Sequence, residues 1–207
     1  MRDFGTDGVR AAGPEVVWHG PEDAPVVVVL DPAGEAKHDE LPATWRPLAE
    51  HLRIGWCRLP AGAEVFDQPP RSAPVHLVAA GTAVEPALRL AQRHSGSVRS
   101  LTAIDPVPAE ASAVDDQHDW WDRDTAPVRQ ELTERGVRVH GFVSRDSDPT
   151  IRIEPPVPLG HPHVVARVVQ LLRSVDPGRP ELAQAWQTVR EQVGPALERA
   201  EETGRTT

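Results

Sequence analysis

The stretch HLVAAGTAVEPALRLA, residues His76–Ala91, decides the fold of this chain. It opens with an apolar run typical of a buried strand, and small residues follow as far as Ala83. Beyond them the apolar residues recur at helical spacing, which predicts an amphipathic helix over Glu85–His94. A strand, a tight turn and a helix in this order form part of a βαβ unit, so we expect a parallel sheet.

The segments on both sides continue this alternation. Runs of apolar and β-branched residues predict strands at Glu15–His19, Pro25–Leu30, Arg53–Arg58, Val75–Ala79, Ser100–Ile104 and Val137–Val143. Helical spacing predicts further helices at Pro42–Leu52, Ala126–Arg135, Pro162–Val175 and Pro180–Thr203, the last of them broken or kinked at Gly194-Pro195. The chain is therefore expected to be α/β, with a mostly parallel central sheet, helices on both faces, three layers and an extra C-terminal helix.

Two units are expected along the chain. Residues 1–177 form the α/β domain, and residues 178–207 form the C-terminal helix and a short disordered tail. That helix carries an apolar stripe at spacings of three and four, made by Leu182, Trp186, Val189, Val193 and Leu197. The stripe either packs on its own domain or forms a helix–helix contact in a homodimer.

Composition excludes several kinds of partner. The 207 residues carry a formal net charge of −9 with no basic run, which argues against nucleic acid or an anionic membrane surface. No apolar run approaches the roughly 18 residues of a membrane span, and charged residues stand where a signal peptide would be apolar. With the lone Cys57 inside a predicted strand, these features favour a cytoplasmic protein that binds a small-molecule ligand or a protein partner and needs no cofactor.

The order of the segments resembles that of the α/β-hydrolase superfamily over Val16–Val175. In that superfamily the stretch from His76 usually carries a nucleophilic serine at the tip of its turn. Aligned without gaps, the serine position falls on Gly81, between the small residues Ala79 and Ala83, and no G-x-S-x-G occurs elsewhere in the chain. Further segments that match in order are PVVVVLDPAG, LRIGWCRLPAG, SLTAIDP, RVHGFVSRDSDP and PLGHPHVVARVVQLL.

The resemblance also implies where the other catalytic groups would stand. His161 matches the catalytic histidine, and Asp148 best matches the acid. Asp146 is the second choice, because the turn has one extra residue, and Asp105 stands at a strand end where some members place the acid. A metal at His161 and His163 would need a third ligand, and no metal site is predicted.

The loop that would form the oxyanion hole is altered as well. Asp31-Pro32 replaces the usual His-Gly pair. Proline has no backbone N–H to donate, and a carboxylate opposes a developing negative charge. Trp120 and Trp121 lie in an acidic segment near the expected mouth of the site. They would close an apolar pocket, bind a partner, or simply cover the end of the sheet.

Two functions follow from this pattern. The first is a pseudoenzyme: an α/β-hydrolase-like protein with a degenerate catalytic site and a ligand-binding or protein-interaction role. The second is an active esterase- or thioesterase-like hydrolase that uses Thr82 as nucleophile, or a His161–Asp pair for proton transfer. Thr82 would otherwise be a hydroxyl that caps the start of a helix. Catalytic activity is therefore left open.

Overall fold

A six-stranded sheet organises the chain. The computed structural model describes residues 16–31, 40–58, 74–108, 120–143 and 155–204. Its strands are β1 (Val16–His19), β2 (Val26–Asp31), β3 (Arg53–Arg58), β4 (Val75–Ala80), β5 (Val98–Ile104) and β6 (Arg138–Phe142). They lie in the order β1-β3-β2-β4-β5-β6, with β1 antiparallel to β3 and every other neighbouring pair parallel.

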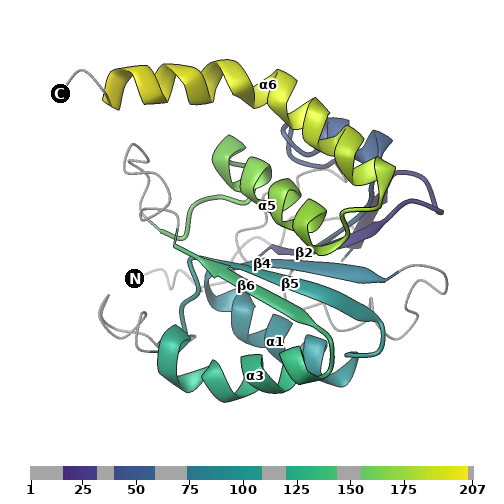
Figure 1. Ribbon diagram of the computed structural model, residues 1–207, viewed down its shortest axis with the longest axis vertical. Helices are drawn as coiled ribbons and strands as arrows, with labels where there is room; N and C mark the ends of the chain where they lie inside the picture. The colour runs from purple at the N-terminus through teal and green to yellow at the C-terminus, as the bar shows by residue number, and fades with distance from the viewer. Residues whose placement is uncertain (1–15, 32–39, 59–73, 109–119, 144–154, 205–207) are drawn as a thin grey trace, which may run out of the picture.

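Helices cover both faces of this sheet (Figure 1). One face carries α1 (Val84–Arg93) and α3 (Ala126–Glu134). The other carries α5 (Pro162–Val175), with α6 (Pro180–Gly204) packed on α5 and touching the short helix η1 (Arg46–Glu50). Two further short helical turns are η3 (Gly81–Ala83) and η4 (Trp120–Asp124). The predicted three-layer α/β architecture with a mostly parallel sheet is confirmed.

The central strands form because both of their faces are covered. All six residues of β2 and all six of β4 are buried, as continuous apolar runs in parallel sheets require. Alternate side chains enter two separate cores. Val27 and Val29 join the core under α5 and α6, whereas Val26 and Val28 join the core under α1.

The region Pro42–Leu52 differs from the predicted α-helix. It forms turns and then the 3₁₀ helix η1, which begins after Trp45. Pro42 and Pro47 supply no backbone N–H, and five residues are too few to propagate an α-helix. The apolar residues whose spacing predicted this helix are nevertheless buried. Trp45, Leu48 and Leu52 have no exposed surface.

The C-terminal helix differs from expectation in one respect and agrees in another. α6 runs from Pro180 to Gly204 without a break at Gly194-Pro195, since a single proline removes one helical hydrogen bond but does not end the helix. Leu182 and Val189 are buried against the core that α5 covers, so this part of the stripe packs on its own chain. The side chains of Val193 and Leu197 lie outside the described residues. Among the described helices, none is long and apolar enough to cross a membrane.

Candidate functional site

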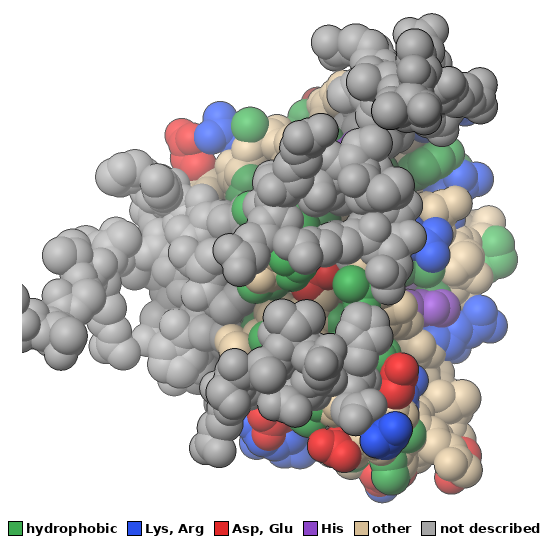
Figure 2. Space-filling view, turned by 90° about the vertical axis from the view of Figure 1, so that its left-hand side faces the viewer, with side chains coloured by type: hydrophobic (Ala, Val, Ile, Leu, Met, Phe, Trp, Pro, Cys, Tyr) green, Lys and Arg blue, Asp and Glu red, His purple; other side chains and the backbone are tan. Residues whose placement is uncertain are grey.

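The residues expected to form a site follow neighbouring parallel strands. Asp31 is the last residue of β2, Gly81 follows β4, and Asp105 follows β5. Because β4 lies between β2 and β5, the turn at Gly81 is flanked by the two carboxylates at one edge of the sheet. Figure 2 views the molecule from this edge, and near the centre of that face a red acidic side chain is seen beside green hydrophobic ones.

Gly81 forms the turn between strand and helix. Its φ of +55° lies in the left-handed region that favours glycine, directly after the extended Ala80. A Cβ placed on Gly81 would lie 3.0 Å from Cγ of Pro156 and 3.9 Å from a methyl carbon of Val107. The next residue, Thr82, is exposed, whereas Gly81 itself is buried.

Asp105 is held in an unusual backbone conformation beside this turn. Its φ is +44°, uncommon for a residue with a side chain, and only 3% of its surface is exposed. Its carboxylate oxygen Oδ2 accepts a hydrogen bond of 2.9 Å from the backbone N–H of Val157. Its own N–H donates to the carbonyl of Phe142 at 3.0 Å. Asp105 thus ties the ends of β5 and β6 to the segment that carries Pro156 over Gly81.

Tryptophan side chains hold the other side of the site. The indole Nε1 of Trp56 donates to Oδ2 of Asp31 at 2.8 Å, which gives the buried carboxylate a hydrogen-bond donor. Trp45 packs edge-on against Trp56, with ring centroids 5.3 Å apart, and donates from Nε1 to the carbonyl of Leu159 at 2.8 Å. Two distant segments, the end of β2 and residues 157–160, are therefore anchored to one aromatic pair.

His161 lies at the start of α5, four residues after Val157. Its backbone N–H donates to the carbonyl of Pro158, and its carbonyl accepts from Val165 at the first turn of the helix. Its ring lies 5.4 Å from that of His163, between centroids. No group of three His, Cys, Asp or Glu side chains that could hold a metal ion occurs within the described ranges. Asp146, Asp148 and Pro32 lie outside the described residues.

Trp120 and Trp121 pack toward the α1 and α3 face of the sheet. The indole of Trp121 lies directly on Gly141 of β6, where any Cβ would collide with the ring. The guanidinium of Arg129 lies over the same ring, 4.6 Å from its centroid, and donates to the carbonyl of Trp121 at 2.9 Å. In this arrangement Trp121 covers part of an edge strand.

A second polar cluster, which the sequence interpretation missed, lies at the opposite edge of the sheet. His76 Nδ1 is 2.8 Å from Oγ of Ser100, and its Nε2 is 3.3 Å from Oδ2 of Asp176. Burial lowers the pKa of His76 to about 4, partly offset by the Asp176 carboxylate. Although the three residue types match a catalytic triad, Ser100 is only 1% exposed and cannot reach a substrate.

Comparison with known proteins gives the following similarities. No family model and no curated protein sequence matches the chain. Among solved structures, a bacterial membrane phospholipase A is 17% identical, with a TM-score of 0.38, covering 86% of this chain and 59% of that one. A thioesterase domain from the curacin biosynthetic pathway is 16% identical, with a TM-score of 0.33, covering 84% and 62%.

A third structure, an N-formylmaleamic acid deformylase from Pseudomonas putida, is 12% identical, with a TM-score of 0.32, and covers 85% of this chain and 68% of that one. The chain spans about three fifths of the length of the first two structures. Its own strand order, the antiparallel edge strand β1 and the two helical layers define an α/β-hydrolase-like fold.

Proposed function

We propose that this protein has a degenerate hydrolase site, with a ligand-binding or protein-interaction role in place of ester hydrolysis. Gly81 stands at the position of the nucleophile in this proposal. The observation that carries it is the backbone of Gly81, which turns directly from β4 toward α1 with a φ of +55°. A strained turn between strand and helix is where α/β-hydrolases present their nucleophile, and glycine has no side chain to attack a carbonyl.

The surroundings of Gly81 support the loss of nucleophilic chemistry. Pro156 is so close that even a Cβ at residue 81 would be in tight contact with its ring. A serine and the carbonyl that it attacks would both need this space. The proline ring therefore stands where an acyl group would have to bind.

The charges around the turn support the same conclusion. Asp31 ends β2 and Asp105 follows β5, and these strands are two strand spacings apart, roughly 10 Å, with Gly81 between them. Two buried carboxylates at this position disfavour the negative charge that builds up on oxygen during acyl transfer. Neutral or cationic groups would instead be stabilised there.

A binding role explains why the carboxylates beside Gly81 are still held in a defined geometry. A positive φ at Asp105 costs on the order of 1–3 kcal/mol, and such strain persists where surrounding contacts enforce it, most often at functional sites. Hydrogen bonds from Val157 and Trp56 hold both carboxylates in place. The site is thus kept in a defined geometry without its nucleophile.

The second candidate is an active hydrolase, and the exposure of Thr82 favours it. Thr82 is exposed next to the buried Gly81. In this mechanism Thr82 would attack the ester, and His161 with an Asp would accept its proton. Proton transfer by His161 and an Asp without a covalent step is the other form of this candidate.

Hydrolysis of a panel of short-chain p-nitrophenyl esters tests the proposal. We expect the wild type and His161→Ala to hydrolyse these esters no faster than buffer. Wild-type turnover that is lost in His161→Ala would overturn the proposal. If turnover were also lost in Thr82→Val, Thr82 would be identified as the nucleophile.

A gain-of-function variant tests the position of Gly81 independently. Gly81→Ser combined with Pro156→Ala and Asp31→Asn supplies a hydroxyl, the space above it and one carboxylate fewer beside it, so we expect ester cleavage above background that disappears when His161→Ala is added. Gly136→Ser is the matched control, because it also places serine at a left-handed glycine, with φ +85°, but away from the site. Equal, background-level rates in both serine variants would contradict the assignment of Gly81.

A further inference from the structure

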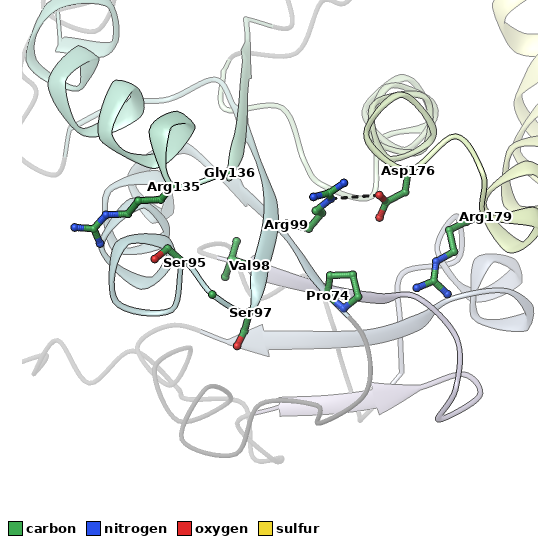
Figure 3. Close-up of a pocket in the computed structure, with 10 residues that line it drawn as sticks. Pro74, Ser95, Ser97, Val98, Arg99, Arg135, Gly136, Asp176 and Arg179 are labelled. Carbon is green, nitrogen blue, oxygen red and sulfur yellow. Dashed lines mark hydrogen bonds and ion pairs between the residues drawn. The ribbon is translucent and has the colours of Figure 1, made fainter.

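A pocket opens at the edge of the sheet opposite Gly81 (Figure 3). It lies where β4 and β5 begin, between Pro74 and the turn Ser95–Ser97, and its volume is about 450 Å³. That volume is within the range of sites for small molecules. The length of β4, roughly 20 Å, separates this pocket from the proposed degenerate site.

The lining of this pocket is strongly basic for an acidic protein. Three arginines and a single carboxylate contribute to it: Arg99, Arg135, Arg179 and Asp176. The arginines come from β5, the turn after α3 and the turn between α5 and α6. In a chain of net charge −9, arginines from three separate segments line one cavity.

Two of these arginines keep donors available. Arg99 uses Nε to contact Oδ1 of Asp176 at 3.3 Å, which leaves the terminal nitrogens of its guanidinium. The guanidinium of Arg179 makes no hydrogen bond or ion pair with any residue in the described ranges. Figure 3 shows both on the side of the pocket where Asp176 lies.

Arg135 lies on the other side of the pocket in Figure 3 and is already paired. It forms an ion pair with Glu131 and donates to the carbonyl of Gln92 at 3.3 Å. It therefore contributes to the rim, and Arg99 and Arg179 are the groups that can bind an anion directly.

The positive charges of Arg99 and Arg179 both act on the imidazole of His76. Both lower the pKa of His76, whose ring lies behind Asp176, because each positive charge disfavours a proton on the imidazole. Both arginines line the same cavity, and Asp176 is the one carboxylate among its described lining residues. An anion bound in the pocket would be attracted by both positive charges.

We propose that this pocket binds the phosphate group of a small organic phosphate. Guanidinium groups match phosphate oxygens with two parallel hydrogen bonds, and two arginines can bind different oxygens of one group. Ser95 and Ser97 line the same cavity, and Ser95 lies beside Arg135, on the side where the organic part of the ligand would bind (Figure 3). The pocket is separate from the site at Gly81, so this binding does not depend on the function proposed there.

Calorimetric titration of the full chain with phenyl phosphate tests this assignment. The experiment is done at low ionic strength and pH 7.5, with phenylacetate as a carboxylate of similar size and inorganic phosphate as the bare group. We expect phenyl phosphate to bind, and Arg179→Gln to weaken binding about tenfold or more because a charge-assisted hydrogen bond is lost. Arg190→Gln on the exposed surface of α6 is the matched control and should bind as the wild type does.

The imidazole of His76 provides a second readout. A bound anion adds negative charge near Arg99 and Asp176, so the pKa of His76 should rise in the complex, as followed by NMR of the ring. Absence of binding at about 10 mM phenyl phosphate, or equal affinity in Arg179→Gln, would overturn the proposal. Tighter binding of phenylacetate would overturn the choice of phosphate.

Discussion

Gly81 meets two separate demands, one on its backbone and one on the space around it. Its φ of +55° is strained for any residue with a side chain, at about 1–2 kcal/mol, and Pro156 fills the space into which a side chain would point. We therefore expect Gly81→Ala to lower the free energy of unfolding in urea by more than Gly136→Ala does. Gly136 has a φ of +85° but nothing within 4 Å of its Cβ position, so it reports the backbone cost alone.

The Gly81→Ala comparison has an internal check. Pro156→Ala removes part of the ring that crowds residue 81, so Gly81→Ala should cost less when it is added to Pro156→Ala than when it is added to the wild type. Equal losses in the free energy of unfolding for Gly81→Ala and Gly136→Ala would show that Pro156 moves aside without lowering stability.

His76 makes the stability of the protein depend on pH. Its pKa falls from 6.5 to about 4 in the folded state, chiefly by burial, with Arg99 and Arg179 adding to the effect and Asp176 opposing it. Above pH 6.5 the ring is neutral in both states. Between pH 6.5 and about 4 only the unfolded chain takes up the proton, so the free energy of unfolding decreases as pH falls, by on the order of 3 kcal/mol.

Unfolding in urea at pH 5 and pH 7.5 measures this dependence. His76→Asn retains a polar group toward Ser100 but does not titrate, so it should lose much less stability between the two pH values than the wild type. His51→Asn replaces a half-buried histidine that contacts Thr188 and should keep the wild-type dependence. The same change with pH in all three proteins would contradict the assignment to His76.

At the scale of elements, α6 is attached to the domain by its first turns. Leu182, Ala185 and Val189 are buried, and Trp186 packs beside them with Arg173 of α5 5.8 Å from its ring centroid. A buried leucine changed to alanine typically costs 2–5 kcal/mol. We expect Leu182→Ala to fall within about that range in thermal or urea unfolding, whereas Ala183→Ser, at an exposed position in the same turn, should be nearly neutral.

The unfolding of Leu182→Ala also distinguishes intrachain packing of α6 from a homodimer contact. A single unfolding transition that shifts for Leu182→Ala means that the helix folds with the domain. An unshifted main transition would mean that the helix is an independent element, as a homodimer contact in place of intrachain packing would require.

Across the whole molecule, the sequence predicted what depends on local patterns. The run Pro25–Leu30 predicted a strand covered on both faces, and the apolar pattern of Pro162–Val175 predicted the helix α5, because each pattern reflects burial directly. The segment Pro42–Leu52 has the same apolar spacing but forms η1, since prolines and its short length outweigh the pattern. Spacing identified which of its residues are buried but not their backbone conformation.

The sites were harder to predict because they depend on contacts between distant segments. Asp105 was one of three candidate acids, and its bond to Val157 spans 52 positions through a backbone N–H that leaves no mark on the sequence. The contact of Pro156 with Gly81 has no signature either. Arg99 and Arg179 are 80 positions apart, and only the fold brings them beside one cavity.

The paired indoles of Trp45 and Trp56 have a practical consequence. Both rings have no exposed surface, they lie edge to face, and their N–H groups are bonded to the segments that enclose the edge of the sheet near Gly81. Rings fixed in an asymmetric surrounding give a circular dichroism signal in the near ultraviolet, and freely rotating rings do not. The part of this signal that is lost in Trp56→Phe belongs to the pair, and it reports without a label whether that edge is ordered.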